Sequence, residues 1–100
     1  MPDSPSPCRK ETEGVIKFSG ALDVYRLDDI YNCLKDSLLS GQDLTLDCLD
    51  IKHMDTAAIQ IFITFRRSFP KEYKLTFINI PPALEQAWEI IGVKQAILKE

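Results

Sequence analysis

The sequence predicts a single α/β domain with about four strands in a mixed sheet and three to four helices. Three observations support this class. The chain has 100 residues, of which 45% are hydrophobic, enough for one core but not for two. Short β-rich segments alternate with segments of helical periodicity, and glycine or proline stands at most of the boundaries between them. Because such an order requires crossover connections, the inner strands of the sheet should be parallel.

The N-terminal half is predicted to contain a leader, a hairpin and a helix. Residues 1–7 include three prolines and are predicted to be a disordered leader, so the domain should occupy residues 8–100. Cys8–Glu11 can pair with Val15–Phe18 through a turn that ends at Gly14. A helix follows, because the next apolar residues are spaced three or four apart on one helical face: Leu27, Ile30, Tyr31, Leu34 and Leu38.

The C-terminal half continues the alternation. Leu44–Cys48 alternates apolar and polar residues as a strand does. A strongly apolar helix is predicted over Thr56–Phe69, and it should end there because Pro70 disfavours helical geometry in the residue before it. Leu75–Ile80 is rich in β-branched and aromatic residues and is predicted to be a strand. Pro82–Gly92 begins with a residue suited to a helix start, repeats at helical spacing, and is followed by a last turn or two of helix.

Composition excludes several classes of protein. The formal net charge is -3 and the basic residues are scattered, which argues against nucleic acid as a partner. The chain has neither a run of about eighteen apolar residues nor a signal-peptide pattern, so a cytoplasmic protein is expected. Its cysteines are odd in number and lack zinc-ligand spacing; we expect buried or idle cytosolic thiols at Cys8, Cys33 and Cys48.

Residues for enzyme chemistry are scarce. His53 is the only histidine, and it is placed in a predicted loop without a Cys or Glu at a spacing typical of a metal site or a nucleophile–base pair. The four glycines are too far apart for a phosphate-binding loop. The sequence therefore predicts no enzyme activity, no metal and no cofactor.

The junction between Asp55 and Thr56 is the strongest functional candidate. A hydroxyl in the first turn of a helix lies beside unpaired backbone N–H groups and the positive end of the helix dipole, where a phosphate can be held or lost. The simpler alternative is that the pair only caps the helix, which contributes about 0.5–2 kcal/mol.

The apolar residues of this helix are too many for one face. One group is expected to face the sheet: Ala58, Ile61, Phe62, Phe65 and Phe69. A second stripe of mixed polarity lies on the flank and contains Thr56, Ile59, Gln60, Ile63 and Arg67. Two interpretations of this stripe stay open. It is either an exposed docking surface with a polar rim, or its two isoleucines pack beneath the first or third helix.

Three short patterns stand in order along the chain. Gly20-Ala21-Leu22-Asp23 follows the first long strand, Asp55-Thr56-Ala57-Ala58-Ile59 opens the apolar helix, and Pro82–Val93 forms a proline-led helix that ends in Gly-Val. In this order and at this spacing the chain resembles the STAS domain, the module of sulfate transporters and anti-sigma-factor antagonists, over roughly residues 14–98. The resemblance implies the STAS-like α/β fold and a non-enzymatic protein-interaction domain in bacterial signal transduction and transcription regulation.

The resemblance also implies a mechanism. Such a domain binds a kinase-like anti-sigma factor or the ATPase subunit of a transporter, and a phosphate near the helix start can release the partner. The usual acceptor position is Ala57 here, whereas Thr56 retains a hydroxyl at the position modified in stressosome-type members. Thr56 is therefore the phosphorylation candidate. The run Asp-Thr-Ala-Ala is also close to the motif of the lipid-asymmetry subfamily, which favours the alternative of constitutive binding in a lipid-transport or chemotaxis complex.

The expected partner surface combines the acidic residues of the two loops with the flank of the helix. It consists of Asp23, Asp55, Thr56, Ala57, Ile59, Gln60, Ile63 and Arg67. A third hypothesis, in which the same helix start binds a nucleotide, follows only from reports on some members of the family. The sequence supplies no catalytic groups for it.

Overall fold

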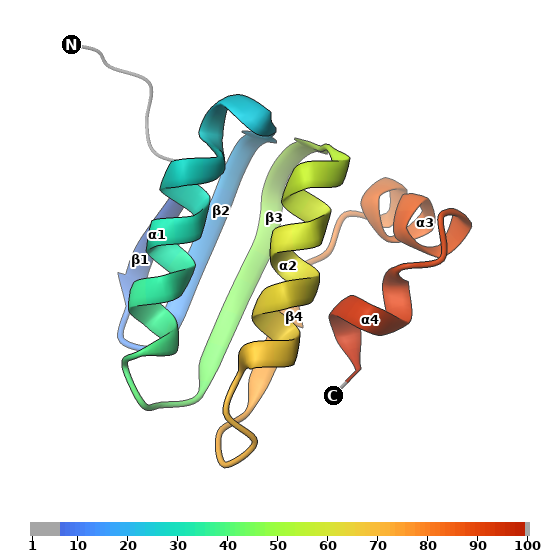
Figure 1. Cartoon of the computed structure of the whole chain (residues 1–100). Helices are drawn as coiled ribbons and strands as arrows, with labels where there is room; N and C mark the ends of the chain where they lie inside the picture. The colour runs from blue at the N-terminus through green and yellow to red at the C-terminus, as the bar shows by residue number, and fades with distance from the viewer. Residues whose placement is uncertain (1–6, 100) are drawn as a thin grey trace, which may run out of the picture.

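The computed structural model describes residues 7–99, and most of the predicted leader, residues 1–6, lies outside this range. The elements follow one another in the predicted order (Figure 1). They are β1 (Cys8–Thr12), β2 (Val15–Leu22), the 3-10 helix η1 (Val24–Arg26), α1 (Leu27–Leu38), β3 (Leu44–Met54), α2 (Thr56–Ser68), β4 (Leu75–Ile78), α3 (Pro82–Ile90) and α4 (Lys94–Leu98).

The four strands form one mixed sheet in the order β1-β2-β3-β4. β1 is antiparallel to β2, as the predicted hairpin requires, whereas β2, β3 and β4 run parallel to one another. Ile16 of β2 is opposite Leu46 of β3, and Leu46 is opposite Phe77 of β4. The predicted α/β class, with parallel inner strands and four helices, is therefore confirmed.

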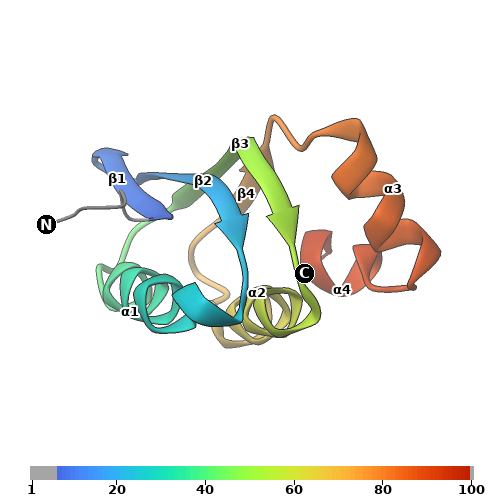
Figure 2. The same cartoon turned by 90° about the horizontal axis from the view of Figure 1, so that it is seen from above.

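Helices α1 and α2 cover one face of the sheet. Figure 2 shows α1 and α2 side by side below this face, with α3 and α4 beyond α2 and the last strand. Aromatic rings join the two layers: the ring centroid of Phe62 on α2 lies 5.1 Å from that of Phe18, 5.8 Å from Phe77 and 6.4 Å from Trp88. Rings at these separations add about 0.5–1.5 kcal/mol per pair to the burial of their area.

Arg66 fixes the C-terminal helix to this core. Only 9% of the residue is exposed, and its guanidinium lies 5.5 Å above the Phe77 ring. Its Nε donates to the carbonyl of Ile97 (2.8 Å), and Nη2 donates to the carbonyls of Leu75 (3.3 Å) and Leu98 (3.2 Å). Because the last carbonyls of a helix have no partner within the helix, this arginine satisfies polar groups at the end of α4 that would otherwise be left without partners.

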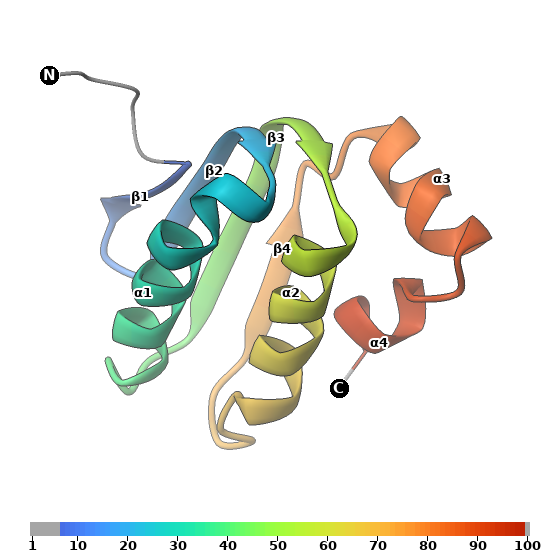
Figure 3. The same cartoon turned by 45° about the horizontal axis from the view of Figure 1, so that its top comes forward.

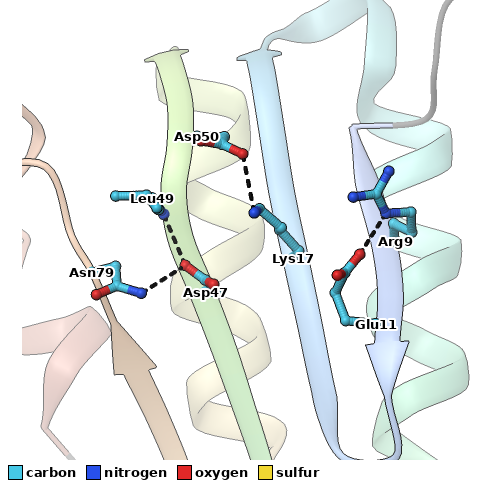
Figure 4. Close-up of polar contacts among 7 residues, drawn as sticks. All are labelled: Arg9, Glu11, Lys17, Asp47, Leu49, Asp50 and Asn79. Carbon is cyan, nitrogen blue, oxygen red and sulfur yellow. Dashed lines mark hydrogen bonds and ion pairs between the residues drawn. The ribbon is translucent and has the colours of Figure 1, made fainter.

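The other face of the sheet carries polar side chains that contact one another (Figure 4). Lys17 Nζ lies 3.2 Å from Asp50 Oδ2, and Asp47 Oδ1 accepts hydrogen bonds from the backbone N–H of Leu49 (3.0 Å) and the side-chain amide of Asn79 (3.2 Å). Such exposed contacts contribute at most about 1 kcal/mol each. They show that alternate side chains of the strands are polar and face solvent on this side of the sheet, whereas the side chains between them face the core on the opposite side.

The prediction of three idle thiols is wrong for two of the cysteines. Cys8 and Cys33 form a disulfide that joins β1 to α1, with their Cα atoms 6.3 Å apart. Cys48 is a buried thiol, as predicted. The pairing could not be predicted from cysteine spacing, because 25 positions separate the two residues and only the packing of α1 behind the hairpin brings them together.

β3 is longer than the sequence suggested. The strand continues from Leu44 through His53 to Met54, so the predicted loop histidine is an exposed residue of the strand. Two register shifts between β2 and β3 accommodate the extra length. As a consequence, β3 reaches the start of α2 directly, and only Asp55 lies between them.

Candidate functional site

Two loops meet where the parallel central strands end. β2 leads into η1 and β3 leads into α2, and both connections lie at the same edge of the sheet (Figure 3). Two hydrogen bonds join them. The backbone N–H of Asp55 donates to the carbonyl of Leu22 (3.0 Å), and the backbone N–H of Val24 donates to Asp55 Oδ2 (2.9 Å). In α/β folds, the carboxyl ends of parallel strands are the usual place for functional residues.

Asp55 organises this junction. Its backbone is extended, and its second carboxylate oxygen, Oδ1, accepts from the backbone N–H of Ala58 (3.1 Å), which makes it the N-cap of α2. One carboxylate therefore caps the helix and holds Val24 of the other loop. Caps of this kind contribute about 0.5–2 kcal/mol, and a negative charge also interacts favourably with the helix dipole. The predicted cap at Asp55 is thus present, and it is compatible with a surface role.

Asp23 plays the same part in the neighbouring loop. Its side chain accepts from the backbone N–H of Tyr25 (3.1 Å) and caps η1. The two predicted acidic residues are therefore held by backbone bonds in adjacent loops, each half-buried. The position of Asp23 next to Val24, which bonds Asp55, brings both carboxylates to the same edge of the sheet.

Thr56 is exposed at the first position of α2. It stands directly after the Asp55 cap, at the end where unpaired N–H groups give a helix its positive pole. Ala57, the next residue, is half-buried. The one hydroxyl in the run Asp55-Thr56-Ala57-Ala58 therefore belongs to a residue that solvent reaches.

The flanking stripe of α2 divides into exposed and buried residues. Thr56, Gln60 and Arg67 are exposed, whereas Ile59 and Ile63 are only 6% and 7% exposed. The interpretation of the two isoleucines as part of an exposed docking stripe is wrong, because both side chains are buried, as the packing alternative requires. The physical reason is that α2 packs against α1, the sheet and α4, so residues on three sides of the helix are covered.

Two apolar residues at the junction were not predicted as part of the site. Val24 is 55% exposed and Tyr25 is 92% exposed, both in η1. The signal in the sequence was weak, because a single tyrosine after an aspartate has no periodicity. Their exposure places apolar surface beside the acidic loops. The flank of α2 does not provide such surface there, because Ile59 and Ile63 are buried.

Three observations describe the reactive side chains near this edge. Within residues 7–99, no group of three His, Cys, Asp or Glu side chains could hold a metal ion. Burial, together with the nearby charge of Asp47, raises the pKa of the Cys48 thiol to about 12, so it supplies no thiolate near neutral pH. His53 lies exposed on β3.

The structure is a small α/β domain with a four-stranded mixed sheet and helices packed against it. An exposed helix start lies at the carboxyl ends of the central strands and forms a candidate surface site at that edge. A family model of the STAS domain matches residues 6–99, and the chain belongs to the STAS family. The resemblance seen in three short patterns is therefore confirmed over nearly the whole chain. STAS domains are typically non-catalytic regulatory modules.

No curated protein matches this chain. Among the helices of residues 7–99, none combines the length and the hydropathy that a membrane crossing requires.

Proposed function

We propose that this STAS domain is a regulatory protein-interaction module whose partner, a kinase-like anti-sigma factor or a transporter ATPase, docks on the start of α2. The observation that carries the proposal is the exposed Thr56 beside two acidic residues that backbone hydrogen bonds hold in place. Because Asp23 and Asp55 accept bonds from their own loops, the surface is formed before a partner arrives, which reduces the entropy lost on binding.

The proposed surface has an apolar part and a polar part. Val24 and Tyr25 supply the exposed apolar area, and tyrosine is among the residues that most often dominate interface energies. Gln60 and Arg67 extend the polar part along α2, with Arg67 about 16 Å from Thr56 along the helix axis. We therefore place the centre of the contact at η1 and the first turn of α2, and Arg67 at its rim.

Phosphorylation of Thr56 would change the charge of this surface strongly. A phosphate adds about -1.5 to -2 charges. The helix start cannot fully compensate them, because Asp55 already accepts the backbone N–H of Ala58. Asp55 and Asp23 would add further negative charge at the same edge, so a partner that tolerates the neutral threonine would be released from the phosphorylated one.

The test combines phosphate mapping with binding. The chain is incubated with a candidate anti-sigma kinase, any phosphate is located by mass spectrometry, and binding to that partner is measured for Thr56→Glu and Thr56→Ala. We expect the phosphate on Thr56, loss of binding by at least about tenfold for Thr56→Glu, and retained binding for Thr56→Ala. Thr64→Glu is the matched control, since it introduces the same charge on the exposed side of α2 two turns later.

A second experiment tests the apolar part of the surface. Tyr25→Ala should weaken binding about tenfold or more, whereas Gln60→Ala should change it less than threefold. Equal effects of the two substitutions, or a phosphate that maps to another residue, would remove this surface from the proposal.

The alternative function is constitutive membership of a lipid-transport ATPase or chemotaxis complex. The observation in its favour is Ala57, which lacks the hydroxyl that related switches use. In that case the methyl and hydroxyl groups of Thr56 contact the partner permanently, so Thr56→Ala should weaken binding as well as Thr56→Glu. Recovery of a transporter ATPase with the native protein would support this alternative, and recovery of a histidine-kinase-like anti-sigma factor would support the switch.

A further inference from the structure

An open cavity lies at the opposite end of α2 from Thr56. It has a volume of about 480 Å³ and is lined by the last turn of α2, the loop that follows it and α4. This volume is within the range of about 300–1,000 Å³ that small-molecule sites occupy. The cavity lies at the other end of α2 from Thr56, and of the residues that we assign to protein binding only Arg67, at the rim of that surface, also lines it.

Cationic side chains dominate the rim of this cavity. Arg67, Lys71 and Lys99 all line it and all are exposed. Within residues 7–99, none of these three takes part in an ion pair. They come together in a protein whose net charge is -3, so the cluster does not reflect a generally basic surface.

The lining of the cavity is partly apolar. Arg66 forms part of the lining, and its guanidinium donates to the carbonyls of Ile97 and Leu98. Phe69 and Pro70 supply apolar surface at the end of α2. Apolar walls with a few convergent polar groups are typical of sites that bind small organic molecules.

A purely structural role for the cations does not account for their number. α2 and α4 both end at this cavity, and each helix end carries at most about -0.5 charge, so cations there stabilise the helices. Two helix ends offset about one positive charge. Among the described lining residues, which include no Asp or Glu, the three rim cations therefore leave a surplus of about two positive charges.

We propose that this cavity, the basic pocket of Arg66, Arg67, Lys71 and Lys99, binds a small phosphate-bearing molecule with a compact apolar body. A phosphate offers three acceptor oxygens and close to two negative charges, which match three separate cations around one cavity. The apolar body would lie against Phe69 and Pro70.

The test uses phenyl phosphate as the probe, with inorganic phosphate and phenol as comparisons. Amide shifts of the ¹⁵N-labelled chain should be saturable and centred on residues 66–73 and 95–99. We expect phenyl phosphate to bind about tenfold more tightly than inorganic phosphate because its ring removes apolar area from water, and phenol to cause no saturable shift. Arg67→Gln, Lys71→Gln and Lys99→Gln should each weaken phenyl phosphate binding about three- to fivefold.

Lys52→Gln is the matched control for these variants. It removes the same charge from an exposed residue of β3, near the start of α2 rather than its end, and should leave the affinity unchanged. The proposal is overturned if the probe does not saturate by about 10 mM, if its shifts centre on residues 55–59, or if Lys52→Gln weakens binding as much as the pocket variants do.

Discussion

Reduction of the disulfide between Cys8 and Cys33 should lower the stability of the domain by a large fraction. In the chain-entropy treatment, a cross-link between residues 25 positions apart removes about 12 cal/mol/K of entropy from the unfolded chain, or about 3.5 kcal/mol at 25 °C. Domains of this size are stable by about 5–15 kcal/mol in total. The single bond therefore accounts for about a quarter to two thirds of the stability.

The structure also predicts which element loses stability first when the disulfide is reduced. β1 is an edge strand that pairs only with β2, and apart from Cys8 the residues of the strand are exposed. The bond to Cys33 connects it to α1, and the backbone N–H of Ser19 donates to the carbonyl of Pro7 just before the strand. Without the cross-link, β1 should exchange its amide hydrogens faster than the parallel strands do.

Urea unfolding followed by circular dichroism is the assay. Wild-type protein is measured with and without reductant, and so is the Cys33→Ser variant. Reductant should lower the unfolding free energy of the wild type by about 3.5 kcal/mol and leave that of the variant unchanged. A thiol titration checks the redox state of each sample: the unfolded oxidised protein should show one free thiol, that of Cys48, and the unfolded reduced protein should show three. A loss below about 1 kcal/mol, or an equal response of the variant, would refute the reasoning.

Three further predictions concern the packing of α2 and the buried thiol. Ile63→Ala should cost about 3 kcal/mol in urea unfolding while Gln60→Ala stays within about 0.5 kcal/mol, since only the isoleucine is buried; equal costs would contradict the burial of this flank. Arg66→Gln should destabilise the domain by about 2–3 kcal/mol and accelerate hydrogen exchange in residues 94–98, because the carbonyls at the end of α4 lose their donor; unchanged exchange there would count against this contact. Burial raises the pKa of Cys48 from 9.0 to about 12, so between these pH values the unfolded chain binds fewer protons than the native one. The unfolding free energy should therefore fall as the pH rises through this window, by up to about 1.4 kcal/mol per pH unit, and comparison with Cys48→Ala at about pH 9 and about pH 10 should isolate this contribution.

The sequence predicted the order and type of the elements because each one carries a local signal. The spacing of apolar residues identified α1 and α2, and proline or glycine set the ends of α2 and α3 within a residue or two. The end of β3 was missed. Leu49 and Ile51 break strict alternation where the strand shifts its register against β2, and a pattern of period two cannot represent such a shift.

The location of the candidate site was predictable, but its composition was not. Asp55 and Thr56 are typical of a helix start, and the expected cap is present. The periodicity of α2 could not show that three sides of the helix are covered, so Ile59 and Ile63 were open to two interpretations. The disulfide and the basic pocket depend on segments far apart in the sequence, α1 with β1 and α2 with α4, and only the packed structure brings these segments together.

The burial of α2 restricts how a partner can recognise this domain. With Ile59 and Ile63 in the core, the exposed side of the helix is polar and offers little apolar area to remove from water. If a partner docks at the start of α2 as proposed, the exposed apolar side chains next to that start are Val24 and Tyr25 of η1. The carboxylate of Asp55 joins η1 to α2, so the apolar contact and the phosphorylation candidate are parts of one rigid junction. A charge added at Thr56 would act on the same contact without any movement of the fold, because the two loops are already joined.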